Sequence, residues 1–257
     1  MIGWLHELPV IWLALVVFAA MALITATILF TVVRLAAGDR GAAVNAVSPG
    51  MLPPMAVVFS LTVAFMAAGV WGDVDRAEDA VDAEASALRS AVLLSDGFST
   101  ATQAQMRTLV RRHIDDAVRH EWPRMERQRA GLSPIPAPLA GALALALGLN
   151  PQRDGQVVAQ REMVAALQRA LDARRVRIVV SEARINVVKW AALLVLAILT
   201  LTAMACVHSA NRTAAAVAMG LFAAAVATVV VMLASQDRPF TGQLGIRPDV
   251  LEQVRPP

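Results

Sequence analysis

Residues 55–71, MAVVFSLTVAFMAAGVW, carry no charged side chain, whereas residues 72–84, GDVDRAEDAVDAE, which follow at once, carry seven. An apolar helix needs roughly 20 residues to cross the hydrocarbon core of a bilayer. The abrupt change near Trp71 therefore indicates a helix that leaves a membrane and continues into water. This boundary between an apolar and a charged stretch organises the interpretation of the whole chain.

Three more stretches resemble residues 55–71 in length and in their lack of charge. Their uncharged gaps cover residues 8–33, 190–211 and 213–236, and the gap around residues 55–71 covers 41–72. Helices in a soluble core rarely remain uncharged over such lengths. The sequence therefore predicts four transmembrane helices, at Leu8–Val33, Met55–Trp71, Trp190–Val207 and Thr213–Ala234.

The composition excludes several classes of protein. The hydrophobic share is 57% and the charged share 17%, which is too apolar for a disordered chain and for an ordinary soluble domain. The net charge of +3 gives no basic footprint for nucleic acid, so no nucleic-acid partner is expected. Cys206 is the single cysteine, so neither an intrachain disulfide nor a cysteine-based zinc site can form.

Four spans place the N-terminus, residues 73–189 and the C-terminal tail on one side of the membrane. Arginines are more frequent in residues 73–189 and in the tail than in the two short loops, so the positive-inside rule places the termini and the middle segment in the cytoplasm. The first span alone favours the opposite orientation, because Arg34 follows it and no Lys or Arg precedes it. Because the total number of Lys and Arg residues outweighs this single span, we place the termini and the middle segment in the cytoplasm.

The segment between the second and third spans has helical patterning. Apolar residues from Val74 to Val92 recur every three or four positions. Residues 156–208 contain neither proline nor glycine, which predicts one long helix, or nearly so, that runs into the third span, and 55–96 lacks proline as well. We expect an all-α integral membrane protein in which a cytoplasmic helical bundle is inserted between spans 2 and 3 and helices continue across the membrane boundary.

The expected organisation has four parts. They are residues 1–72 with spans 1 and 2, residues 73–189 as the cytoplasmic helical domain, residues 190–236 with spans 3 and 4, and residues 237–257 as a tail. Pro239 ends the fourth helix and leaves Phe240 able to fold back, while Arg238 can pair with an acidic residue. We therefore expect Arg238 and Phe240 to dock the tail on the soluble helices, the alternative being a disordered terminus.

Six carboxylates lie within twelve residues just after the second span: Asp73, Asp75, Glu78, Asp79, Asp82 and Glu84. One interpretation is a solvated helix face. A second is a ring of negative charge at a pore mouth, formed by Asp75, Asp79 and Asp82 when an oligomer repeats them around its axis. A third is calcium binding, although the chain has no twelve-residue calcium loop.

Catalytic patterns are absent from the sequence. There is no glycine-rich phosphate loop, no nucleophile elbow and no dinucleotide fingerprint, so we expect no enzyme and no cofactor. His113, Asp116 and His120 share one helical face by their spacing and could ligate a transition metal, but a polar face is the commoner explanation, and no metal site is expected.

Several short motifs are spread along the chain. They are Trp71 with the acidic helix of Asp75, Glu78 and Glu84, the run Glu121-Trp122-Pro123 with Met125, the run Leu171-Asp172-Ala173-Arg174-Arg175 with Arg177, and the tail Asp237-Arg238-Pro239-Phe240 with Gly242, Leu244, Ile246, Pro248 and Leu251. In these residues the chain resembles the bestrophin-like proteins of bacterial membranes. With the spans, the resemblance covers nearly the whole chain.

The resemblance implies a homo-oligomeric ion channel, pentameric as true bestrophins are, in the bacterial inner membrane. Monovalent ions would pass through an axial pore lined by the second span, with Phe59, Thr62, Val63 and Met66 as candidate pore positions. The chain lacks the acidic calcium clasp of true bestrophins after the fourth span, so calcium gating is not expected. The alternative is a membrane-anchored helical sensor or scaffold without transport activity; a membrane enzyme ranks third.

Overall fold

The computed structural model describes residues 9–37, 47–132 and 135–257, and within these ranges the chain is helical with no strand. The chain divides into two compact units. Unit 1 combines the residues up to Trp71 with Arg184–Asp237, and unit 2 combines Gly72–Ala183 with Arg238–Pro257. The predicted start of the first span, Leu8, lies outside the described residues.

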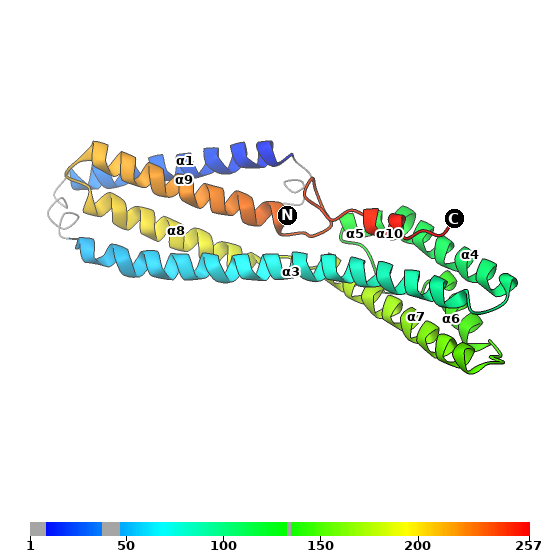
Figure 1. The fold of residues 1–257 in the computed structure, drawn as a ribbon. Helices are drawn as coiled ribbons and strands as arrows, with labels where there is room; N and C mark the ends of the chain where they lie inside the picture. The colour runs from blue at the N-terminus through cyan, green and yellow to red at the C-terminus, as the bar shows by residue number, and fades with distance from the viewer. Residues whose placement is uncertain (1–8, 38–46, 133–134) are drawn as a thin grey trace. The chain divides into compact units, whose positions relative to one another are not determined.

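Unit 1 is made of long apolar helices. They are α1 (Val10–Ala36), the first part of α3 (Leu52–Ser95), α8 (Val187–Val207) and α9 (Arg212–Gln236), and the short 3-10 turn η2 (Pro49–Met51) precedes α3. Figure 1 shows α1 and α9 side by side, and α8 contacts both of them. Each of the four helices is long and apolar enough to cross a membrane, which agrees with the four predicted spans.

The surface of unit 1 is apolar as well as its interior. Leu193, Leu201 and Met219 are fully buried between the helices, but Phe65 is 75% exposed and Leu221 70% exposed. Large apolar side chains distributed over an outer surface are unfavourable in water and favourable in a lipid environment. The chain is therefore a multi-pass membrane protein whose helices contact lipid.

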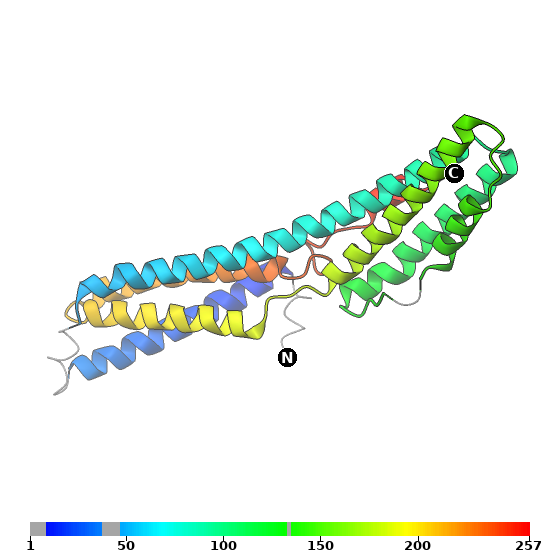
Figure 2. The ribbon, with the colours of Figure 1, turned by 90° about the horizontal axis from the view of Figure 1, so that it is seen from below.

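Unit 2 is a bundle of helices around its own core. It contains the second part of α3, α4 (Thr100–Asp116), the π-turn η3 (Ala117–Glu121), α5 (Trp122–Glu126), α6 (Ala137–Leu147), α7 (Asp154–Ser181) and the short α10 (Asp249–Gln253). The apolar helix α6 contacts α4 and α7, as Figure 2 shows. Leu88, Met106, Leu139 and Leu167 are fully buried at the centre of this unit.

The prediction of one long helix over residues 156–208 is wrong. Helix α7 ends at Ser181 and α8 begins at Val187. The Asn186 side chain caps the new helix by accepting a hydrogen bond from the Val188 amide at 3.0 Å, and the Asp237 carboxylate accepts one from the Ile185 amide at 2.5 Å. Asparagine is a favoured N-cap, so a helix can begin here without proline or glycine. In contrast, α3 is a single helix from Leu52 to Ser95.

Candidate functional site

Five ionisable side chains meet in the core of unit 2, where apolar residues surround them. Four elements supply them: Glu84 comes from α3, His113 from α4, Glu121 from η3, and Arg174 and Arg177 from α7. Each of the five is at most 9% exposed. Charged groups are almost never buried to this extent unless they are paired. We call these five residues the buried charge network.

Arg177 is the centre of the buried charge network. Its Nε donates to Glu84 Oε2 at 2.7 Å and its Nη2 donates to Glu121 Oε2 at 2.8 Å. The guanidinium carbon lies 4.8 Å from the centre of the Trp122 ring, which adds a cation–π contact. Because one guanidinium bonds carboxylates from α3 and η3, Arg177 ties α7 to both elements.

Arg174 and His113 complete the network. Arg174 Nε donates to Glu121 Oε1 at 2.8 Å, so Glu121 is held between two arginines. His113 Nε2 lies 2.8 Å from Glu84 Oε1, so Glu84 is held between Arg177 and His113. The two carboxylates and two guanidiniums balance in formal charge, which limits the cost of burying them.

The pKa of Glu84 shows how strongly the network favours the carboxylate. Glu84 lies beyond Trp71, where the apolar part of α3 ends. Burial alone raises the pKa of Glu84, but the positive charge of Arg177 and the hydrogen bond with His113 outweigh it and lower the pKa from 4.5 to about 2. Burial also acts to lower the pKa of Arg177, whereas Glu84 and Glu121 raise it above its usual value. Both groups therefore remain charged across the physiological pH range.

A π-turn positions Glu121 in the network. The Trp122 amide donates to the carbonyl of Ala117, five residues earlier, instead of the usual four. Pro123 follows directly, and it lacks the amide hydrogen that would continue the regular helix. A single extra residue in the turn changes the phase of the helix, so Glu121 and Trp122 both point into the core, where they are 9% and 3% exposed.

The three residues proposed as a metal-binding face are not brought together. His113 is buried against Glu84, whereas His120 lies at the surface and its Nδ1 is 2.8 Å from Asp116 Oδ1. The π-turn begins after His113 and contains His120, so it changes the direction of His120 relative to His113. Within the described ranges, no group of three or more His, Cys, Asp or Glu side chains could hold a metal ion.

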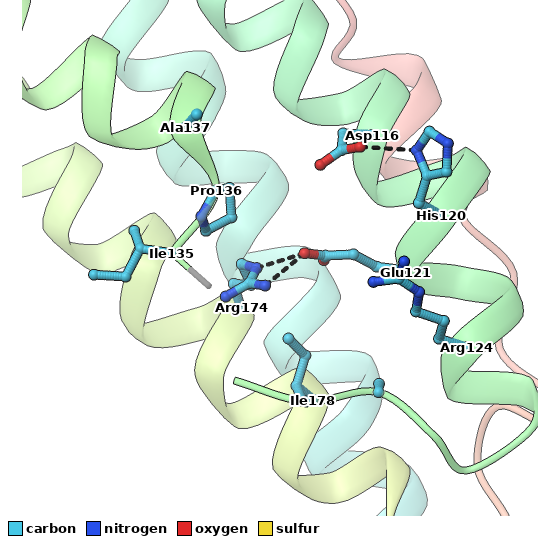
Figure 3. A pocket seen from close by; sticks show the side chains of 11 residues that line it. Asp116, His120, Glu121, Arg124, Ile135, Pro136, Ala137, Arg174 and Ile178 are labelled. Carbon is cyan, nitrogen blue, oxygen red and sulfur yellow. Dashed lines mark hydrogen bonds and ion pairs between the residues drawn. The ribbon is translucent and has the colours of Figure 1, made fainter. Parts of the chain in front are cut away.

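A pocket of about 450 Å³ adjoins the buried charge network. Figure 3 shows that Arg174 and Glu121 form one wall, while Asp116 and His120 come from the end of α4 and from η3. Residues from Ile135 to Ala137 and Ile178 of α7 supply apolar surface. The pocket therefore combines paired charges with an apolar lining.

The tail lies on the helices of unit 2. Phe240 is 3% exposed and packs edge-on against Trp122, with ring centres 5.7 Å apart. Trp122 Nε1 donates to the carbonyl of Ile246 at 3.0 Å, and Thr241 Oγ1 donates to the carbonyl of Glu126 at 2.8 Å. Near the end of the chain, Arg255 pairs with Asp115 at 2.7 Å.

Two glycines let the tail fold back in a tight loop. Gly242 has a φ of 84°, a conformation that side chains disfavour. A Cβ on Gly245 would lie 2.9 Å from the carbonyl carbon of Phe240, and the Ile246 amide closes the loop on the carbonyl of Pro239 at 2.8 Å. Arg238 lies at the start of this loop, where its carbonyl accepts from the Thr241 amide. Its predicted pairing with an acidic residue stays a prediction.

The candidate pore residues lie on the inner side of α3 within unit 1. Phe59 is 8% exposed and its ring packs on Phe222 of α9, and Met66 is 5% exposed. Val63 packs against the same apolar core, and Thr62 donates back to the Val58 carbonyl within its own helix. The opposite side of α3, which includes Phe65, is exposed in the single chain. Whether α3 lines a pore stays a prediction.

The six carboxylates after Trp71 fall into different environments. Asp75, Asp79 and Asp82 are exposed, and Asp73 pairs with Arg76 one turn away. Glu78 and Asp82 border a second pocket, of about 460 Å³, which the tail helps to form. Glu84 is buried in the charge network. The run is therefore not one solvated face, because its last member belongs to the core.

The sequence alone does not predict that these five residues form a buried network. Glu121, Arg174 and Arg177 enter it only through the family resemblance, Glu84 also as one of the six carboxylates after the second span, and His113 as a possible metal ligand. A signal was present: Glu84 follows Ala77 and Val81 at helical spacing, so it interrupts an apolar stripe. Charged residues inside an apolar stripe are candidates for buried pairs.

Comparison with protein families decides the relationship of the chain. Residues 19–251 match the model of the bestrophin-like domain. The chain belongs to the bestrophin-like family. The match includes all four apolar helices in large part, both pockets and most of the tail, so the resemblance noted from the sequence is confirmed. Comparison with curated proteins and with solved structures finds no match.

Proposed function

We propose that this bestrophin-like chain forms a homo-oligomeric, non-enzymatic ion channel in the bacterial inner membrane, with an axial pore lined by α3. The observation that carries the proposal is the uncovered side of α3. Leu61 and Phe65 are exposed in unit 1, and Asp75, Asp79 and Asp82 are exposed in unit 2. Membership of the bestrophin-like family supports the same role.

The spacing of these residues along α3 supports one pore-facing stripe. Leu61, Phe65, Ala68, Gly72, Asp75, Asp79 and Asp82 follow one another at alternating steps of four and three. In a helix such steps define a narrow seam that faces a common neighbour or axis. Because Phe59 and Met66 are already buried within the chain, we assign the pore to this seam and not to their side of α3.

Apolar side chains of the seam would form the constriction, and the carboxylates would form the mouth. A narrow apolar ring can stop ion flow by expelling water, so Phe65, the largest residue of the seam, is the expected gate. Permeation through such a pore is passive and needs no bound cofactor. The pentameric state of true bestrophins is carried to this chain as part of the proposal.

Recording from purified protein in planar lipid bilayers tests this function. We expect ion currents from the full chain, and a several-fold larger conductance from Phe65→Ala, because the variant widens the apolar ring. Leu221→Ala is the matched control, since Leu221 is similarly exposed on α9 but lies outside the seam. A bilayer that stays silent for both wild type and Phe65→Ala, together with a protein partner recovered in pull-downs, would instead favour the membrane-anchored scaffold.

The exposed carboxylates predict a preference for cations. Rings of aspartate at a pore mouth attract cations, and the effect weakens beyond about 8 Å at physiological salt. We expect a cation-selective reversal potential under a salt gradient, and a shift toward zero in the triple variant Asp75→Asn, Asp79→Asn, Asp82→Asn. Asp249→Asn, a change on the tail helix α10, serves as the control. An anion-selective wild type would contradict the acidic mouth.

The positive-inside rule predicts the orientation of the channel. We propose that both termini and residues 73–189 lie in the cytoplasm. A reporter inserted near Gly131, which is exposed in unit 2, should be active as a cytoplasmic fusion, and one inserted at Asn211, between α8 and α9, should be active as a periplasmic fusion. Enzyme-fusion assays in cells give both results, and the reversed pair would overturn the orientation.

A further inference from the structure

The pocket beside Arg174 has the features of a binding site for a small molecule. Its volume of about 450 Å³ lies in the lower part of the range of ligand pockets, roughly 300–1,000 Å³. It is formed within unit 2 by residues of α4, η3, α5, α7 and the segment that leads into α6. The proposed pore does not use this pocket.

The pocket contains hydrogen-bond donors that have no partner among the described residues. Arg174 is 6% exposed, and its Nε and Nη2 both bond Glu121 Oε1, at 2.8 Å and 2.6 Å. Among the described residues no partner is bonded to its Nη1. Arg124 also lines the pocket, and within the described part of the chain its guanidinium has no ion-pair partner. Two guanidiniums at one pocket are suited to bind a carboxylate.

The same pocket also contains acceptor groups. Asp116 uses Oδ1 for His120, and among the described residues its Oδ2 has no hydrogen-bond partner. The carboxylates and guanidiniums that line the pocket, Asp116 and Glu121 against Arg124 and Arg174, balance in formal charge. A ligand with a single charge would therefore meet repulsion from one half of the lining. A ligand that carries one charge of each sign would not.

The remaining surface of the pocket is apolar. Pro136 and Ile178 are buried and Ile135 is exposed at its edge, so the pocket offers aliphatic contacts to a side chain of similar size. Figure 3 shows these apolar residues around Arg174 and Glu121. Apolar contact area supplies affinity, while the charged groups fix the orientation of the ligand.

We propose that this pocket binds a small zwitterion with an aliphatic side chain, the chemical class of the aliphatic amino acids. Its carboxylate is bound by Arg124 and by Nη1 of Arg174. Its ammonium is bound by Asp116, and its side chain lies against Ile135, Pro136 and Ile178. This inference does not depend on ion conduction, so its failure would leave the proposed channel function untouched.

Equilibrium dialysis of the full chain in lipid nanodiscs tests the inference, with radiolabelled leucine as the probe and empty nanodiscs as the blank. We expect saturable binding of leucine. Two analogues separate the contributions of its charges, since 4-methylpentanoate lacks the ammonium and 3-methylbutylamine lacks the carboxylate. Each should compete at least tenfold more weakly than unlabelled leucine, because each leaves one set of charged groups without its partner.

Two variants locate the bound probe. Arg124→Gln and Asp116→Asn should each weaken leucine binding about tenfold, and neither disturbs the buried charge network, because both residues lie outside it. Arg112→Gln, an exposed change on α4 away from the pocket, is the control and should bind like the wild type. Absence of saturable binding, equal competition by 4-methylpentanoate, or unchanged binding by Arg124→Gln would each overturn the inference.

Discussion

Replacement of Arg177 by methionine is expected to destabilise unit 2 by about 3–5 kcal/mol, the usual cost of removing one partner from a buried ion pair. Methionine fills much of the space of arginine, but it leaves Glu84 without its guanidinium and Glu121 with only Arg174. Both carboxylates remain buried in an apolar core. The loss therefore arises from uncompensated charge and not from a cavity.

Hydrogen exchange followed by mass spectrometry measures this effect in the purified full chain, because it reports on unit 2 separately from the apolar helices. We expect amides in the buried parts of α3 and α7 in unit 2 to exchange roughly 100- to 4,000-fold faster in Arg177→Met, as about 1.4 kcal/mol corresponds to each factor of ten.

Two further variants define the cause. Arg175→Met changes an exposed arginine on the same helix and should stay within about 0.5 kcal/mol of the wild type. Glu84→Gln combined with Arg177→Met removes the charge that Arg177 neutralises, so part of the protection should return. If Arg177→Met exchanges like Arg175→Met, the network does not hold the helices together.

The features that were predictable from the sequence are those with a regular signal. Uncharged stretches of membrane-spanning length located four apolar helices, and the predicted third span, Trp190–Val207, falls within the apolar helix Val187–Val207. The family could be recognised from short motifs spread along the chain. Those motifs include residues that lie in the core of unit 2, such as Trp122 and Arg177.

The features that were missed depend on tertiary contacts. The break between α7 and α8 carries neither proline nor glycine, and its N-cap at Asn186 is a common residue in many contexts. The π-turn at Ala117–Glu121 changes the phase of the helix. Residue spacing therefore predicted one face shared by His113 and His120, whereas the structure points them in different directions. A prediction from residue spacing assumes one regular helix. The break between α7 and α8 and the π-turn each interrupt that regularity.

Glu84 is a buried residue within a run of acidic residues. Five carboxylates precede it within a short run, so the sequence groups it with an acidic helix face. Its spacing from Ala77 and Val81 places it in the apolar stripe, and the structure buries it against Arg177. The same pattern recurs in α7, where Arg174 and Arg177 continue the buried series of Met163, Leu167 and Ala170. Charges that interrupt an apolar stripe on two helices predict a buried pair.

Removal of the tail is expected to destabilise unit 2 by more than 3 kcal/mol. Truncation after Asp237 keeps the hydrogen bond to the Ile185 amide in unit 1 but removes Phe240 and Leu251, which are 3% and 0% exposed. It also leaves Trp122 Nε1 without its acceptor, the Ile246 carbonyl. A single Phe→Ala change in a core costs about 3–5 kcal/mol, so Phe240→Ala alone should reproduce much of the effect.

The readout for the tail is hydrogen exchange in α5 and in the adjoining η3. Helix α5 carries Trp122 and Glu126, which contact the tail directly. We expect these amides to lose protection in the truncated chain and in Phe240→Ala, while the apolar helices of unit 1 keep theirs. Leu244→Ala is the matched control, because Leu244 lies in the same tail but is 60% exposed. Unchanged protection after truncation would mean that the tail covers the helices without stabilising them. Faster exchange in Leu244→Ala than in Phe240→Ala would mean that the Phe240–Trp122 contact is not what holds the tail.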